Sequence, residues 1–162
     1  MLIVTQLIML PAMEKYCRDL LFLLNDMGRL LRVEADCRAR AHGMTRAQWT
    51  ILIWLDRQPG LSQKELADLL EVEPITVARL VDRLEGRGMV ERRADPGDRR
   101  IWRLHLRPAA EPVLADIAAQ RADILHTITS GLDPTARETL VTSLLHMKAT
   151  LAAERRAAKE AA

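Results

Sequence analysis

Residues 74–106 read PITVARLVDRLEGRGMVERRADPGDRRIWRLHL, and the spacing of their apolar side chains changes halfway along. In the first part, apolar residues recur at steps of three and four, which is typical of a helix with one buried stripe. These residues are Val77, Leu80, Val81 and Leu84. After Gly88 the apolar residues alternate, and the turn-forming run Asp95-Pro96-Gly97-Asp98 separates two such segments. The stretch therefore predicts a helix followed by a β-hairpin.

A second short helix is expected just before this stretch. Ser62 and Glu65 match the capping box, in which each side chain bonds the backbone N–H of the other residue. Its expected core face consists of Leu66, Leu69 and Leu70. Only residues 71–73 separate this helix from Pro74, which suits the first turn of the next one. Two short helices with a tight break, followed by a hairpin, form a winged helix-turn-helix.

Two further helices are expected on the N-terminal side. A long amphipathic helix is predicted over 13–41, ended by Gly43. A capping box of Thr45 and Gln48 then opens a helix that Pro59 stops. This helix is apolar nearly all round, so its core residues are predicted to be buried. They are Trp49, Ile51, Leu52, Ile53, Trp54 and Leu55.

Two more helices are expected behind the hairpin. The first runs from Pro108 to about Ser130, with its start bent at Pro112 and its end capped by Gly131. Asp133-Pro134 begins the last helix by the rule of an N-cap followed by proline. Its Ala-rich tail over 152–162 is expected to fray.

These elements predict a mainly α-helical fold with a small β-hairpin wing. Residues 1–162 are expected to form a single domain, in which about 45–106 is the winged lobe. About 13–41 and 108–155 form a helical dimerisation region. The terminal helices carry more apolar side chains than the small lobe can cover, so a second copy of the chain is expected to bury them.

Arginines are concentrated in the predicted helix-and-wing segment. The formal net charge of the chain is only +2, which by itself predicts no nucleic-acid partner. Between Arg79 and Arg107, however, nine arginines stand against five acidic residues. Their planar, forked guanidinium groups suit phosphates and base edges. The distribution therefore indicates double-stranded DNA as a partner.

The outward face of the second short helix holds the candidates for reading bases. A major groove admits one helix, and residues near its start reach the bases. Arg79 could bond two acceptors of guanine, Thr76 a base or phosphate, and Ile75 a thymine methyl. Arg83, one turn further on, is expected to reach phosphate.

The hairpin tip brings Asp98, Arg99 and Arg100 together. Two arginines in a loop suit the negative potential of a narrow minor groove. Asp98 is expected to orient one of them through a bidentate pair. The alternative is a solvated, salt-bridged turn of little energetic value.

The same residues resemble the MarR (multiple antibiotic resistance regulator) family. The likeness extends over about 20–151 and is carried by residues 77–85, 88–92, 98–100 and 104–106. Pro74, the Asp98-Arg99-Arg100 triplet and Ala110-Glu111-Pro112 resemble the SlyA branch. One departure is Arg107-Pro108, because the family usually has a threonine there that caps the next helix.

The resemblance implies a homodimeric transcription regulator. Its first, fifth and sixth helices would interlock with those of a second copy, and its two winged lobes would bind a pseudo-palindromic operator. Members commonly repress, and they release DNA when a small anionic or aromatic ligand, or an oxidant, changes the spacing of the lobes.

Two candidate sensors follow. Arg38, His42, Met44 and Trp49 could form a pocket for an aromatic carboxylate where family ligands often lie, although ordinary core packing is the favoured explanation, because a Trp on an apolar helix usually packs in the core. Alternatively, Cys17 or Cys37 senses oxidants. The two cysteines lie on one predicted helix, about 30 Å apart at about 1.5 Å per residue, so only an intersubunit or mixed disulfide is compatible with it.

Other classes of function find little support. The four histidines are far apart in the chain, so no zinc site is predicted, and no catalytic motif or cofactor-binding loop is present. The chain is therefore expected not to be an enzyme. A winged helix that binds only proteins remains an alternative, against which the retained arginines argue.

The apolar start over 2–10 is too short to span a bilayer and lacks a basic leader, so a packed arm and a cytoplasmic location are expected.

Overall fold

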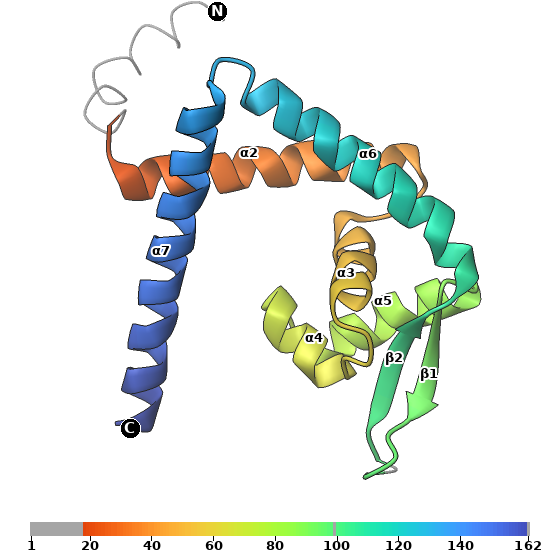
Figure 1. Ribbon diagram of the computed structural model, residues 1–162. Coiled ribbons are helices and arrows are strands. Elements are labelled where there is room, and N and C mark those ends of the chain that lie inside the picture. Colours follow the sequence, from red (N-terminus) through yellow and green to blue (C-terminus); the bar gives the residue numbers. More distant parts are fainter. Residues whose placement is uncertain (1–17, 99, 162) are drawn as a thin grey trace, which may run out of the picture. The chain divides into compact units, whose positions relative to one another are not determined.

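The computed structural model describes residues 18–98 and 100–161. The described chain is mostly helical and has one antiparallel hairpin (Figure 1), which confirms the predicted fold class. In order, the elements are α2 (Leu20–Ala41), α3 (Arg46–Arg57), α4 (Gln63–Leu70), α5 (Pro74–Gly86), β1 (Val90–Ala94), β2 (Trp102–Leu106), the 3₁₀ helix η1 (Pro108–Ala110), α6 (Glu111–Ile128) and α7 (Pro134–Glu160). The chain divides into two compact units, one ending at Ile117 and one beginning at Ala118.

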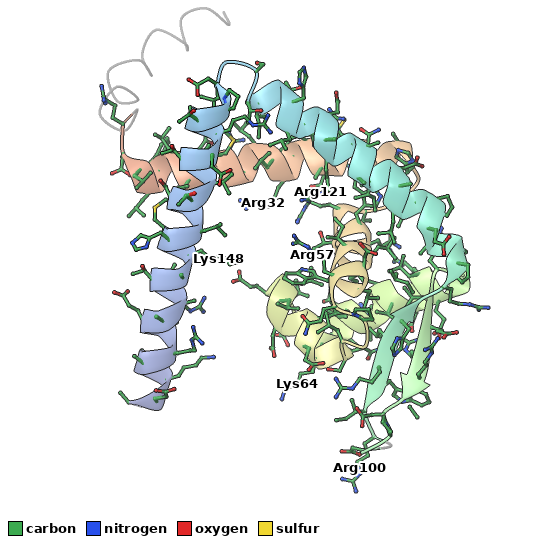
Figure 2. The ribbon with its side chains drawn as sticks, in the orientation of Figure 1. Arg32, Arg57, Lys64, Arg100, Arg121 and Lys148 are labelled. Atoms are coloured by element: carbon green, nitrogen blue, oxygen red, sulfur yellow. The ribbon has the colours of Figure 1, made fainter. Side chains whose placement is uncertain are left out.

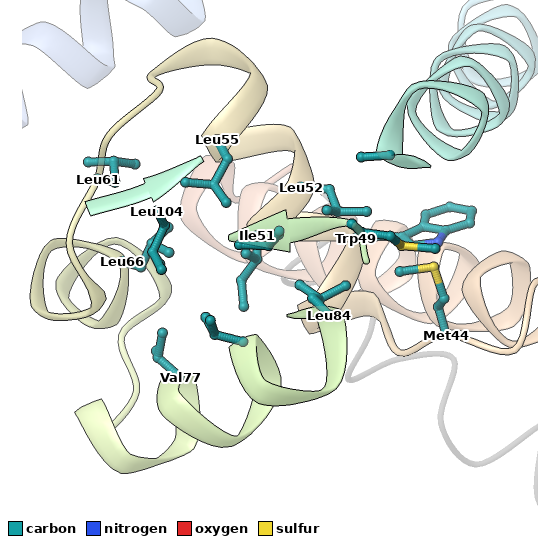
Figure 3. Close-up of a cluster of buried hydrophobic side chains, with 14 of the residues drawn as sticks. Met44, Trp49, Ile51, Leu52, Leu55, Leu61, Leu66, Val77, Leu84 and Leu104 are labelled. Atoms are coloured by element: carbon teal, nitrogen blue, oxygen red, sulfur yellow. The ribbon is translucent and has the colours of Figure 1, made fainter. Parts of the chain in front are cut away.

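The core of the first unit lies between α3, α4, α5 and the hairpin (Figure 3). Its largest fully buried side chains include Ile51, Leu52, Leu55, Leu66, Val77, Val81, Leu84 and Leu104. Burying one such side chain stabilises a fold by about 1.5–3 kcal/mol. The predicted apolar stripe of α5 therefore does face inward. Ile53 and Trp54 of α3 are only partly buried, and Leu69 of α4 is 41% exposed, so its predicted place in the core is wrong.

Both predicted capping boxes are present. The Thr45 side chain accepts from the backbone N–H of Gln48, and the Gln48 side chain accepts from that of Thr45. Ser62 and Glu65 make the same reciprocal pair at the start of α4. These bonds satisfy N–H groups that a helix start otherwise leaves unpaired.

The long N-terminal helix begins later than predicted. Its N-cap is Asp19, whose carboxylate accepts from the N–H of Phe22, so α2 starts at Leu20 rather than Met13. At the other end Gly43 has φ +64°, and the N–H groups of Gly43 and Met44 bond Arg40 and Ala39 in a Schellman motif. Residues 1–17, including the predicted arm and Cys17, lie outside the described residues. The helix predicted over 13–41 is interrupted at Asp19, so the predicted 30 Å separation of the two cysteines no longer follows from it.

The break between α4 and α5 is tight. Glu71 has φ 54°, a left-handed conformation that ends α4, and Pro74 occupies the first turn of α5 as predicted. The N–H of Thr76 bonds the carbonyl of Glu73. The direction of α5 is thus set by three residues of backbone.

The wing pairs β1 with β2 in a register that places Val90 opposite Leu106 and Ala94 opposite Trp102. Alternation along β2 buries Leu104 completely, whereas Trp102, nearer the tip, is 50% exposed. Backbone bonds from Gly60 N–H to the Leu104 carbonyl and from Leu104 N–H to the Leu61 carbonyl, both 2.9 Å, attach β2 to the segment before α4. The wing is therefore part of the core rather than an appended loop.

Arg103 fastens the wing to α4 from the other face of β2. Its Nε donates to Asp95 Oδ2 at 2.6 Å and its Nη1 to Glu65 Oε2 at 3.0 Å and to the Gly60 carbonyl at 3.3 Å. The hydrogen bond from Arg103 is the main cause that lowers the pKa of Asp95. Backbone and side-chain bonds from Ser62, and then Arg103, lower the pKa of Glu65.

The helix after the wing starts differently from the prediction. Arg107 makes no side-chain cap, and Pro108 opens η1 instead, so the departure at Arg107-Pro108 does remove the cap. Because α6 begins only at Glu111, Pro112 lies in its first turn, where a proline removes no helical hydrogen bond. The predicted bend at Pro112 is therefore replaced by the 3₁₀ turn.

The second unit contains the rest of α6 and all of α7. Asp133 accepts from the N–H of Ala136, which confirms the predicted N-cap. α6 ends at Ile128, so Gly131 does not cap it, and α7 stays helical to Glu160 where fraying was expected. None of the described helices is both long and apolar enough to cross a membrane.

We predict that Arg103→Gln lowers the unfolding midpoint Tm at pH 7 but has little effect near pH 2. Both carboxyl pKa values are lowered in the folded state, so their stabilisation is complete above the unfolded value of about 4 and is lost as the pH falls through the folded values. Thermal unfolding of both proteins across this range measures the difference.

Arg93→Gln is the matched control, because Arg93 pairs with Glu91 of its own strand and joins no two elements. Its Tm should follow that of the wild type closely. An equal loss at pH 7 and pH 2 in Arg103→Gln would mean that Arg103 acts by packing and not by charge.

Candidate nucleic-acid interface

The outward face of α5 carries the three predicted base-reading residues and Arg83, the predicted phosphate contact. Ile75 is 61% exposed, and Thr76, Arg79 and Arg83 are exposed as well. The cause is the helical period, because the opposite stripe is buried against α3 and α4. Within the described residues, the side chains of Arg79 and Arg83 form no ion pair. Both guanidinium groups can therefore bind a ligand outside the chain.

The acidic residues of α5 are occupied by a different arginine. Arg92 of β1 donates to Asp82 Oδ1 at 2.6 Å through Nη2 and to Glu85 through Nη1. One cation thus binds two carboxylates that would otherwise repel a phosphate backbone. It also joins β1 to the helix that precedes it.

The wing tip is shaped by two aspartates. Asp95 Oδ1 accepts from the N–H groups of Gly97 and Asp98 at 2.7 and 3.0 Å, and Asp98 Oδ1 accepts from the N–H of Arg100 at 2.9 Å. Arg100 is exposed at the end of the hairpin (Figure 2). Arg99 lies outside the described residues, so a pair between it and Asp98 stays a prediction.

Sequence reasoning missed the residues that hold the wing in place. Asp95 was assigned only to the turn and Arg103 only to the charge count, yet together with Glu65 they form the link between wing and α4. Strand alternation gave a signal, because Arg103 and Leu104 must point to opposite faces of β2. Which acids Arg103 meets depends on the tertiary fold.

Three of the four predicted sensor residues, His42, Met44 and Trp49, lie between the end of α2 and the first turn of α3. Met44 and Trp49 are 4% and 5% exposed and belong to the core, and the rings of His42 and Trp49 are 5.7 Å apart. His42 Nδ1 lies 3.7 Å from Asp116 Oδ2. Arg38, one turn earlier, bonds Glu34 Oε1 at 2.6 Å. Core packing therefore explains two of the four.

One polar atom in this cluster stands out. The buried indole Nε1 of Trp49 has no hydrogen-bond partner among the residues that the structure describes. A buried, unsatisfied N–H costs about 1–3 kcal/mol. No group of three or more His, Cys, Asp or Glu side chains in the described chain could hold a metal ion.

A family model described as MarR family matches residues 42–101, which span α3 to the tip of the wing. Solved structures of regulators extend the likeness to most of the chain. The transcriptional regulator PA3341 is 36% identical with a TM-score of 0.70, and the match covers 80% of this chain and 96% of that one.

Two further structures agree. A MarR crystal structure is 29% identical with a TM-score of 0.73, covering 86% of this chain and 95% of that one. The regulator SlyA, at 24% identity and a TM-score of 0.72 over 84% of this chain and 96% of that one, shares the fold. Membership of the SlyA branch stays a prediction. The family model and the structural matches over most of the chain together show that the chain belongs to the MarR family of transcriptional regulators.

Proposed function

We propose that the chain represses transcription by binding a pseudo-palindromic operator as a homodimer. The observation that carries this proposal is the face of α5, where Arg79 and Arg83 are exposed and form no ion pair among the described residues. The acids of the same helix are already paired with Arg92.

In this proposal α5 enters the major groove. The groove is about 12 Å wide and admits one helix, so the exposed residues of its first two turns meet base edges. Arg79 bonds the two major-groove acceptors of a guanine, Thr76 bonds a base or phosphate, and the largely exposed Ile75 side chain contacts a thymine methyl. Arg83 contacts phosphate.

The wing reaches the neighbouring minor groove with Arg99 and Arg100. Asp95 and Asp98 fold the tip by accepting backbone N–H groups, and this presents Arg100 to solvent. A narrow minor groove attracts arginine through its negative potential. The contact positions the protein more than it selects bases.

A second copy is needed because large apolar side chains remain exposed in both units. On α2 they include Leu20, Leu21, Phe22, Leu23, Leu24, Met27, Leu30, Leu31 and Val33. On α7 they include Leu140, Val141, Leu144, Leu145 and Leu151. Soluble monomers rarely expose apolar surface on this scale, and a symmetric dimer is the most economical cover.

The effector proposed for this regulator is a small aromatic or anionic molecule bound near Arg38, His42, Met44 and Trp49. The unsatisfied Nε1 of Trp49 supports this, because a carboxylate of the effector could accept a hydrogen bond from it. Control by oxidation is the alternative, with Cys37, which is exposed on α2, as the described thiol.

We expect purified protein to sediment as a dimer and to enrich an inverted repeat from a pool of random duplexes. The two recognition helices of a dimer meet successive major-groove faces, so half-site centres should lie about 10–10.5 base pairs apart. Sedimentation velocity and sequencing of the bound pool measure the two properties. A monomer that shifts no duplex at low salt would contradict the proposal, and a dimer that shifts none would favour a protein-binding module.

We predict that Arg79→Ala costs about 1–3 kcal/mol on the enriched duplex and relaxes base preference at one position of each half-site. The reason is the loss of a two-bond contact to one base. Gel-shift titrations on the enriched duplex and its single-base variants measure both effects.

Two variants distinguish recognition of a base from electrostatic contact with the DNA. Arg100→Ala should weaken binding equally on all duplexes and flatten its salt dependence. Arg155→Ala, at an exposed position near the end of α7, should leave affinity unchanged. If Arg79→Ala weakened all duplexes equally, Arg79 would be a phosphate contact.

We predict that Trp49→Phe makes the protein–DNA complex less sensitive to aromatic acids while the core stays intact. Phenylalanine keeps an aromatic ring in the core but lacks the N–H. Release of the enriched duplex by a panel of aromatic acids beginning with benzoate measures the response. Trp54→Phe, at a partly buried position on the same helix, is the control. If aromatic acids released the duplex equally from both variants, Trp49 would not be part of the effector site.

A further inference from the structure

We propose that a hollow between the start of α4 and the start of β2 holds one phosphate of the DNA backbone, which makes Lys64 a positioning contact for the duplex. The hollow has a volume of about 230 Å³. Its lining consists of Ser62, Gln63, Lys64, Arg100, Ile101 and Trp102. The inference rests on the proposed function and adds to it a contact outside the recognition helix.

The two walls of the hollow are held together by the backbone. Ser62 and Arg103 form an antiparallel β-bridge, and the Leu104 N–H bonds the Leu61 carbonyl at 2.9 Å. The Arg103 guanidinium links the same two walls through Asp95 and Glu65. The hollow is therefore already formed in the free protein, so little entropy is lost when a ligand enters it.

The charge balance of the hollow is positive. Lys64 on α4 and Arg100 on the wing contribute one cation each (Figure 2). In the part of the chain that the structure describes, neither side chain is ion-paired. The acid closest in sequence, Glu65, is bonded by Ser62 N–H at 2.7 Å and by Arg103 at 3.0 Å. Lys64 thus remains for an external anion in the hollow, and Arg100, which the proposed function places in the minor groove, adds positive potential at its rim.

The start of α4 and the ring of Trp102 complete the site. The capping box uses the Glu65 N–H, whereas a helix start has no intrahelical partner for its first N–H groups, here those of Gln63 and Lys64. Such groups together with the helix dipole favour an anion. The half-exposed indole of Trp102 offers an apolar face for a deoxyribose and an N–H for a phosphate oxygen.

The position of the hollow favours a phosphate of the DNA backbone over a free anion as its ligand. In the proposed complex, α5 lies in a major groove and the wing tip in the adjacent minor groove. One sugar-phosphate strand separates these two grooves, and it must pass between the helical part of the lobe and the wing. The hollow lies between those elements, since one wall is formed by residues 62–64 at the start of α4 and the other by residues 100–102 of the wing.

The test combines Lys64→Gln with neutral methylphosphonate links placed one at a time along the enriched duplex. The variant should bind about tenfold more weakly on every duplex, and the slope of log K against log salt should fall by about 0.9. At one link per half-site, between the major-groove and minor-groove contacts, the neutral link should weaken wild type but not Lys64→Gln. Lys148→Gln, an exposed lysine on α7, should behave as wild type at every link.

Other outcomes overturn the inference. If wild type shifts the duplex and Lys64→Gln matches it at every link, the hollow holds no phosphate, while the proposed function stands. If millimolar inorganic phosphate quenches tryptophan fluorescence in wild type but not in Trp102→Phe, and no link couples to Lys64, the site takes a free anion. If wild type binds no duplex, both the proposed function and this inference are wrong.

Discussion

The complete burial of Leu104 is the constraint on which the rest of the lobe depends. This side chain lies in the same core as the inner stripe of α5, and the backbone on either side of it is bonded to the segment before α4. Because strand side chains alternate, burying Leu104 forces Arg103 to the opposite face of β2, where it meets Asp95 and Glu65. The position of the wing relative to α5 is thus decided in the hydrophobic core.

The sequence predicted those elements whose cause is local. Capping boxes at Thr45 and Ser62, the stripe of α5, the proline at its first turn and the alternation of the wing are each encoded within a few residues, and the structure contains them all. The predicted burial of Leu69 is wrong because helical spacing shows which face of a helix is apolar but not how far the neighbouring elements extend over that face.

The errors at helix ends and in the site have related physical causes. Asp19 is as good an N-cap as any residue before it, so periodicity alone placed the start of α2 too early. Pro112 does not disrupt the hydrogen bonds of α6, because η1 forms the first turn after the wing and Pro112 then lies in the first turn of α6. The exposed face of α5 could be predicted, but the ion pairs of Arg92 and Arg103 could not, since they join residues from different elements.

The contrast between the two faces of α5 has an evolutionary consequence. Val77, Val81 and Leu84 are fixed by packing, whereas Ile75, Thr76 and Arg79 contribute little to the core. Substitutions on the outer face therefore carry a small penalty in folding free energy, so drift and selection can explore them freely. If these residues read DNA as proposed, a gene duplicate of this regulator could acquire a new target sequence in a few mutational steps while its scaffold stays unchanged.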